Sequence, residues 1–130
     1  DHHDVDVALA PGSPDAFDKI RLLRGVLERF RGTVENRGVR LLAVVVPSGV
    51  DLDPGSAIRV DPARWPTYDP AQLAETFREA SESAGIETLD LWSVFLSAGP
   101  EDLFVGGLDF HWNDRGQALA AERTAARLAR

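Results

Sequence analysis

Apolar residues recur at helix-like and strand-like spacings along the chain, and these spacings predict the order of its elements. Residues 4–10 favour a short strand, because their apolar content rises toward the end. Ser13 and Pro14 then suit the N-cap and first position of a helix. Apolar residues follow at steps of three and four up to Gly38, which predicts one long helix with a single apolar face: Phe17, Ile20, Leu23, Leu27, Phe30 and Val34.

A second strand is predicted over residues 40–47, where an unbroken apolar run ends at Pro47. Unbroken runs of this kind are typical of strands that are buried on both faces of a sheet. Strand, helix and strand in this order form a βαβ unit, so we expect the two strands to be parallel.

The rest of the chain predicts a long irregular loop over residues 48–69, a helix over 69–84 and a third strand over 86–91. A loop then leads to a last helix over residues 113–129, for which we expect four inward residues: Ala118, Ala121, Ala125 and Leu128. The whole pattern predicts one α/β domain over residues 1–130, with helices on both sides of a parallel sheet in three layers.

Composition narrows the classes of partner. The chain has 130 residues, a net charge of -7 and a pI of about 4.8, so nucleic acid is a poor partner for it. It contains no cysteine, which excludes disulfides and thiolate metal sites. No apolar run approaches the roughly 20 residues that a membrane helix needs. Because the chain begins at Asp1 and lacks methionine, we expect it to be part of a longer protein.

The stretch with the clearest chemistry is residues 106–116, Gly-Gly-Leu-Asp-Phe-His-Trp-Asn-Asp-Arg-Gly. Asp109 lies two residues before His111, and a carboxylate at this spacing can orient an imidazole as a general base. Asn113 is a good N-cap for the helix that follows. Alternatively, His111 and Trp112 simply close the last helix onto the core.

The expected topology places the candidate site at one edge of the sheet. In parallel α/β sheets, ligands bind at the carboxyl ends of the strands. Gly12 and Ser13 follow the first predicted strand, Ser48 follows the second, and the loop with His111 follows the third. We therefore expect Gly12, Ser13, Ser48 and Trp112 to contact substrate beside the catalytic pair Asp109 and His111.

Residues 109–116, followed by an alanine-rich helix, resemble the last sequence block of the SGNH (GDSL-type) hydrolase superfamily. The Asp-x-His-Trp form looks most like the branch that includes polysaccharide O-acetyltransferases and esterases. The resemblance implies a flavodoxin-like α/β/α fold that here lacks its first strands. It also implies a Ser-His-Asp triad in which His111 is the base and Asp109 its orienter.

Two departures from the family pattern concern the rest of the catalytic machinery. The family's Gly-x-Asn-Asp block corresponds to residues 12–15, where Gly12 and Asp15 match but Pro14 replaces the oxyanion asparagine. Nothing in the chain matches the family's Gly-Asp-Ser block. We therefore expect the nucleophilic serine to lie upstream of Asp1, and expect Ser13 and Ser48 to be a helix cap and a turn residue.

Three hypotheses remain open at this stage. The first is an esterase or acyltransferase acting on an O-acyl ester, either a small molecule or a polysaccharide, without a cofactor. The second is a catalytically inactive α/β domain that binds a glycan or a protein partner. The third, a metal site, would use His2 and His3 with Asp109 and His111. The resemblance favours the first hypothesis and an extracytoplasmic location.

The predicted first strand also implies a particular partner. If residues 4–10 form an edge strand, their backbone groups would pair either with a segment outside this chain or with the same strand in a homodimer.

Overall fold

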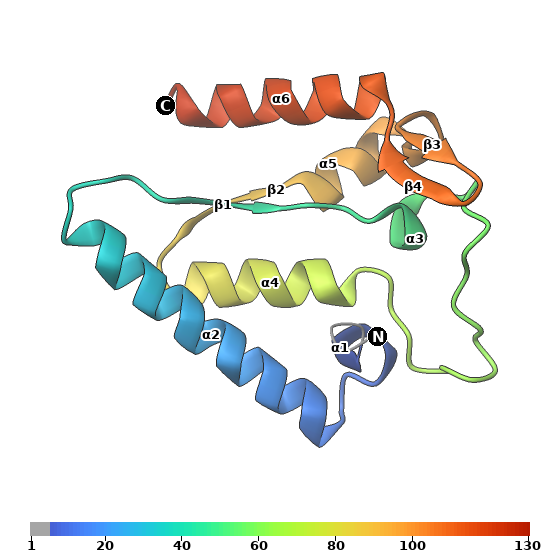
Figure 1. Ribbon diagram of the computed structural model, residues 1–130, viewed down its shortest axis with the longest axis horizontal. Helices are drawn as coiled ribbons and strands as arrows, with labels where there is room; N and C mark the ends of the chain where they lie inside the picture. The colour runs from blue at the N-terminus through green and yellow to red at the C-terminus, as the bar shows by residue number, and fades with distance from the viewer. Residues whose placement is uncertain (1–5) are drawn as a thin grey trace. The chain divides into compact units, whose positions relative to one another are not determined.

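The computed structural model of the chain describes residues 6–130. Helices and strands follow one another in a mixed α/β order (Figure 1). The chain divides into two compact units. The first unit runs to Val45 and resumes over Asp61–Thr88, and the second consists of Val46–Val60 and Leu89–Arg130. Within the described residues, no helix combines the length and the apolar character that crossing a membrane requires.

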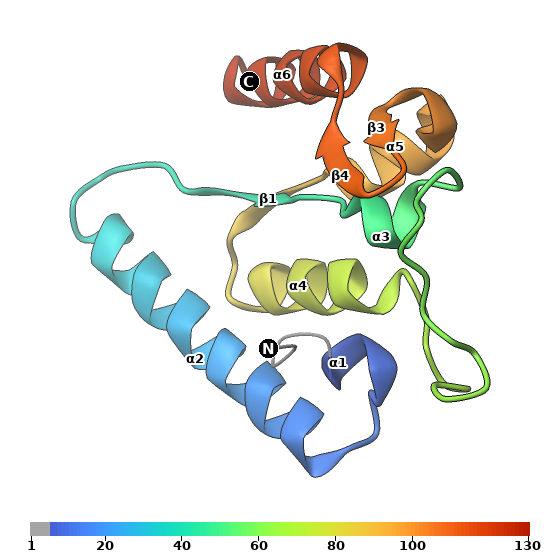
Figure 2. The same ribbon diagram turned by 45° about the vertical axis from the view of Figure 1, so that its right-hand side comes forward.

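The first unit is built on two packed helices, α2 (Pro14–Glu35) and α4 (Gln72–Ser83), with the short α1 (Asp6–Leu9) against both (Figure 2). Ala16 and Ala80 are almost completely buried.

The strand predicted over residues 4–10 is wrong for residues 6–9, which form α1. Val7 and Ala8 are both buried, and two adjacent residues can share one side of a helix but point to opposite faces of a strand. The chain then turns, with the Ser13 N–H donating to the carbonyl of Ala10. Residues 4 and 5, like His2 and His3 of the metal hypothesis, lie outside the described residues.

Three of the four ends of the long helices follow the predictions, but α4 begins at Gln72 with no side-chain cap, later than the start predicted at residue 69. Ser13 is the N-cap of α2, and its Oγ accepts a hydrogen bond from the Ala16 N–H at 3.1 Å. Gly38 and Gly85 follow α2 and α4 with φ of 66° and 69°, a left-handed conformation that favours glycine. The predicted apolar face of α2 is wrong at Phe17 and Phe30, which are 62% and 55% exposed.

Strands β1 (Leu42–Val45) and β2 (Glu87–Asp90) pair in a two-stranded sheet. Both are shorter than predicted. Val45 is buried but the rest of β1 is half-buried, so the expectation of burial on both faces holds for Val45 alone. The mixed α/β content agrees with the predicted fold class at this coarser level.

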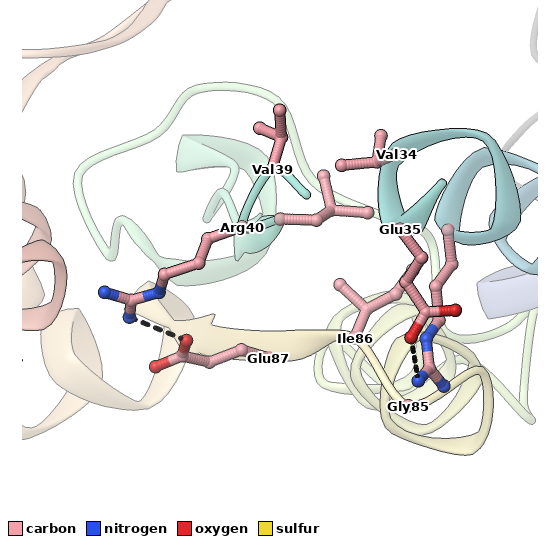
Figure 3. Close-up of a pocket in the computed structure, with 9 residues that line it drawn as sticks. Val34, Glu35, Val39, Arg40, Gly85, Ile86 and Glu87 are labelled. Carbon is pink, nitrogen blue, oxygen red and sulfur yellow. Dashed lines mark hydrogen bonds and ion pairs between the residues drawn. The ribbon is translucent and has the colours of Figure 1, made fainter. Parts of the chain in front are cut away.

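A small hollow of about 220 Å³ lies where α2 and α4 end in the first unit (Figure 3). Its charged side chains neutralise one another. Arg31 pairs with Glu35 at 2.6 Å and also donates to the carbonyl of Ala84, while Arg40 pairs with Glu87 at 3.2 Å. Since each of these charges has a partner on the protein, we interpret this hollow as a structural junction.

The second unit places the candidate site on a β-hairpin. Strands β3 (Phe104–Gly106) and β4 (Asp109–Trp112) pair antiparallel, and β4 leads directly into α6 (Asp114–Leu128) (Figure 2). Three shorter elements complete the unit: α3 (Gly49–Leu52), α5 (Leu91–Ala98) and the 3-10 turn η1 (Pro100–Asp102). Its core holds Leu91, Phe95, Leu103, Phe104 and Ala120.

Two predictions for this unit need correction. Asp109 and His111 lie on a strand and not in an open loop, because residues 104–112 form the hairpin. The predicted inward face of the last helix is also wrong, since Gly116 and Ala120 are the buried residues of α6. Ala118, Ala121, Ala125 and Leu128 are exposed.

Candidate active site

The centre of the candidate site is a hydrogen-bonded pair on β4. The Nδ1 of His111 donates to Oδ1 of Asp109 at 2.7 Å, and the backbone N–H of His111 donates to the same oxygen at 3.0 Å. The contact expected between these side chains is therefore present. With its Nδ1 proton held by the carboxylate, the imidazole keeps Nε2 as the nitrogen that can accept a proton.

Electrostatics favour the charged form of the carboxyl group. The hydrogen bond from the His111 backbone N–H, followed by that from its side chain, lowers the pKa of Asp109 below its ordinary value. Asp109 is thus a carboxylate at neutral pH. A carboxylate in this position fixes the tautomer of the imidazole and can stabilise the imidazolium that forms after proton uptake.

Trp112 anchors the strand that carries this pair. Its ring lies 4.9 Å from the ring of the fully buried Phe95, which in turn contacts Phe104 at 5.8 Å. Its Nε1 donates to the carbonyl of Pro47 at 3.2 Å. Trp112 therefore joins β4 both to the aromatic core and to the segment that follows β1.

Asn113 fixes the end of the strand and the start of α6. Its Oδ1 accepts from the N–H groups of Arg115 and Gly116 at 2.9 and 3.1 Å, which confirms it as the N-cap. Its Nδ2 donates to the carbonyls of Asp102 and Phe104 at 2.9 and 3.0 Å. One side chain thus ties η1, β3 and α6 together directly beside the candidate base.

Ser48 and Gly49 bring a second segment against β4. Ser48 is the N-cap of α3, with its Oγ accepting from the Val50 N–H at 3.1 Å. A Cβ on Gly49 would stand 2.8 Å from both Cβ and O of Phe110, so this close approach requires glycine. Sequence reasoning identified Ser48 but missed the role of Gly49, which depends on a contact between distant residues.

These elements surround a shallow hollow of about 430 Å³ in the second unit. The side chain of His111 is 81% exposed, so a reactant could reach it without any movement of the protein. The hollow is lined by Val46, Pro47, Ser48, Phe110, His111, Trp112 and Gln117.

The structure brings four of the six predicted site residues together. Ser48, His111 and Trp112 line the hollow, and Asp109 joins them through His111. Gly12 and Ser13 belong to the first unit, where Ser13 caps α2. Sequence reasoning missed Phe110, although its position between Asp109 and His111 was a usable signal. Within the described residues, no group of histidines and carboxylates is arranged to hold a metal ion.

Comparison with known proteins connects this geometry to a family. Residues 12–130 match the family described as SGNH hydrolase-like domain, acetyltransferase AlgX. The chain is also similar to a protein of Pseudomonas aeruginosa described as probable alginate O-acetylase AlgJ, with 28% identity over 125 residues. That match covers 96% of this chain but 30% of the relative's length. No solved structure matches the chain.

Proposed function

The chain belongs to the SGNH hydrolase-like family of AlgX-type acetyltransferases, and from this membership we propose that it serves in transfer or hydrolysis of O-acyl groups, such as O-acetyl, on a carbohydrate. The observation that carries the proposal is the hydrogen-bonded Asp109–His111 pair beside an accessible hollow. The similarity to a probable alginate O-acetylase supports a polysaccharide as the substrate.

In the proposed mechanism, His111 is the general base and Asp109 its orienter. Nε2 of His111 accepts the proton of a serine hydroxyl while the serine oxygen attacks the acyl carbon. The imidazolium then gives this proton to the departing oxygen, which leaves an acyl-serine. A sugar hydroxyl or water attacks the acyl-serine in the second step, and His111 accepts its proton. The imidazolium then returns this proton to the serine oxygen as the bond between that oxygen and the acyl carbon breaks.

We place the nucleophilic serine outside the 130 residues, and the order of the family's sequence blocks puts it upstream. Ser48, which lines the hollow, accepts a hydrogen bond as the cap of α3. Among the described residues, no hydrogen bond joins a serine to His111. The oxyanion donors are expected from other segments too, since Pro14 has neither a side-chain amide nor a backbone N–H.

The wider architecture that we propose is a single three-layer domain in which further strands extend the β1–β2 sheet. Among the described residues, β1 and β2 each pair only with the other, so each has one free edge. A segment outside the chain or a second copy could pair with that edge. This replaces the pairing edge first expected at residues 4–10, because residues 6–9 are helical.

The proposal is tested with the full-length protein and an aryl acetate. His111→Ala should lower kcat/KM by about 10²–10⁴-fold, the usual contribution of a general base, and Asp109→Asn should also lower it markedly. Glu122→Gln, an exposed change on α6, is the matched control and should leave activity unchanged. Turnover that persists without His111 would refute the mechanism. The 130 residues alone should show no turnover that depends on His111.

A fluorophosphonate that labels activated serines locates the nucleophile in the full-length protein. A labelled serine outside the 130 residues supports the proposal, whereas labelling of Ser48 would place the nucleophile in the hollow itself. If no serine is labelled and no hydrolysis occurs, the inactive glycan- or protein-binding domain becomes the better description. The absence of a serine bonded to His111 among the described residues favours that second candidate.

A further inference from the structure

We propose that the hollow beside His111 is the subsite for the sugar ring that carries or receives the acetyl group. In this subsite Phe110 is the stacking surface, and Ser48 and Gln117 hydrogen-bond the sugar. The inference rests on the proposed function and names the residues that recognise its carbohydrate substrate.

Phe110 presents an aromatic ring directly beside the candidate base. The residue is 45% exposed, and its ring is stacked with the imidazole of His111, with centroids 5.7 Å apart and planes at 15°. Its backbone packs closely against Gly49, which holds the ring in place. A sugar ring has a face of C–H groups, whose partial positive charge is attracted to the negative face of an aromatic ring. A sugar stacked on Phe110 would therefore have one edge next to His111.

Two polar side chains on the walls keep hydrogen-bonding capacity that no other described residue uses. Ser48 Oγ accepts from the Val50 N–H at 3.1 Å, which leaves its hydroxyl hydrogen free to donate. Gln117 Nε2 donates to the Trp112 carbonyl at 3.3 Å, which leaves Oε1 free to accept. A sugar hydroxyl can both donate and accept, so this donor and this acceptor match the groups along the edge of a sugar ring.

The form of the hollow suits one sugar of a longer chain. Its volume of about 430 Å³ lies within the range of about 300–1,000 Å³ that is usual for ligand sites, and mostly apolar walls with a few polar groups are their usual lining. The hollow is also shallow, and its lining residue Val46 is 66% exposed. Neighbouring sugars could therefore continue across the surface, whereas an acetyl group alone would leave most of these walls uncovered.

The test compares the release of acetate from two esters by the full-length protein. One is an acetylated alginate oligosaccharide, and the other is ethyl acetate, which has no ring to stack. Phe110→Ala should lower kcat/KM for the oligosaccharide roughly two- to tenfold more than kcat/KM for ethyl acetate, the usual effect of an aromatic contact. Gln117→Met keeps the length of the side chain but removes the amide acceptor, and it should lower the same ratio by a similar factor.

Leu108→Ala is the matched control, because Leu108 is a 77% exposed apolar residue of the same hairpin that does not line the hollow. It should leave the ratio of the two kcat/KM values unchanged. If Phe110→Ala and Gln117→Met also left this ratio unchanged, the inference would be overturned, while His111-dependent hydrolysis of ethyl acetate would still support the proposed function.

If the oligosaccharide is not hydrolysed, or neither ester is, binding decides instead. The probes are unacetylated oligosaccharides of glucose, mannose, galactose and mannuronate, added to the full-length protein. At least one of them should shift the NMR signals of the Phe110 ring and the Gln117 amide in a saturable way, and Phe110→Ala should weaken its binding roughly two- to tenfold. Signals that none of these sugars shifts would refute the subsite independently of catalysis.

Discussion

Asp109 Oδ1 accepts two hydrogen bonds from a single residue, His111, one from the backbone N–H at 3.0 Å and one from Nδ1 at 2.7 Å. The backbone bond fixes the carboxylate with respect to the strand, and the side-chain bond then fixes the imidazole with respect to the carboxylate. The orientation of the ring therefore depends on local backbone geometry, although both side chains are largely exposed.

This double contact predicts how Asp109 titrates. Because the backbone N–H is the larger cause of its lowered pKa, His111→Ala should raise the pKa of Asp109 only part of the way to that of an ordinary aspartate. Carbon-detected NMR of the Asp109 carboxyl group measures its pKa in the wild type and in His111→Ala. A variant whose Asp109 titrates like an ordinary aspartate would show that the side chain, and not the backbone, sets the pKa.

The same pKa shift has a defined sign for stability. A carboxyl group whose pKa is lower in the folded state contributes stability above its unfolded pKa, and this contribution disappears as the pH falls through the folded value. The contribution of Asp109 should therefore be lost in the acid range below the ordinary aspartate pKa. Asp109→Asn should lack that contribution at neutral pH and should lose less stability than the wild type as the pH falls through the acid range, which chemical denaturation at several pH values would measure.

Asn113 has two roles that mutation can separate: its Oδ1 caps α6, and its Nδ2 donates to the carbonyls of two neighbouring segments. Asn113→Ala removes the cap of α6, which alone costs about 0.5–2 kcal/mol, and also leaves the carbonyls of Asp102 and Phe104 without their donor. Asn113→Asp keeps an N-cap oxygen but places a second oxygen against those carbonyls. Both variants should therefore unfold at lower denaturant concentration than the wild type.

Ser13→Ala is the matched comparison, because Ser13 makes a single cap hydrogen bond at the start of α2. Its loss of stability should be smaller than that of Asn113→Ala. If Asn113→Asp were as stable as the wild type, the hydrogen bonds donated by Nδ2 would contribute nothing to the free energy of unfolding.

Much of the local structure could be predicted from the sequence. Ser13, Asn113, Gly38 and Gly85 mark helix ends through their own chemistry, so no distant contact is needed to identify them. The spacing of Asp109 and His111 likewise predicts their hydrogen bond, since the two residues are neighbours on one short segment.

Features that depend on distant contacts could not be predicted in this way. In α6, alanines on several sides give little apolar contrast, and the buried face is chosen by the approach of Leu103 and Trp112 to Gly116. The helix α1 forms because Val7 and Ala8 are buried together, although their sequence context favours a strand. Gly49 matters because of Phe110, which lies far away in the sequence.

Gly116 should be intolerant of a side chain. An added Cβ would stand 2.4 Å from the Leu103 carbonyl oxygen and 3.1 Å from the Trp112 Cβ. Gly116→Ala should therefore destabilise the protein by about 1–3 kcal/mol, as overpacked substitutions do. Chemical denaturation gives the change in free energy of unfolding.

Gly25→Ala is the control for this effect, because Gly25 also lies within a helix but has no atom near its added Cβ. Alanine there should stabilise the protein by about 0.5–1 kcal/mol through its better helix propensity. Opposite signs for the two substitutions would support steric exclusion at Gly116, whereas a stabilised Gly116→Ala would contradict it.

Gly49 connects packing to the candidate site most directly. In Gly49→Ala, the added Cβ would meet Cα, Cβ and O of Phe110 at 2.8–2.9 Å. Two of these three atoms belong to the backbone, so a change of rotamer cannot relieve the contact, and either α3 or β4 must move. Because His111 is the next residue of β4, the substitution should shift its NMR signals and lower activity as well as stability. Gly12→Ala, with open space around its Cβ, should leave the His111 signals, the activity and the stability unchanged. A Gly49→Ala variant with unchanged His111 signals would show that α3 moves alone, and that the position of the base does not depend on this contact.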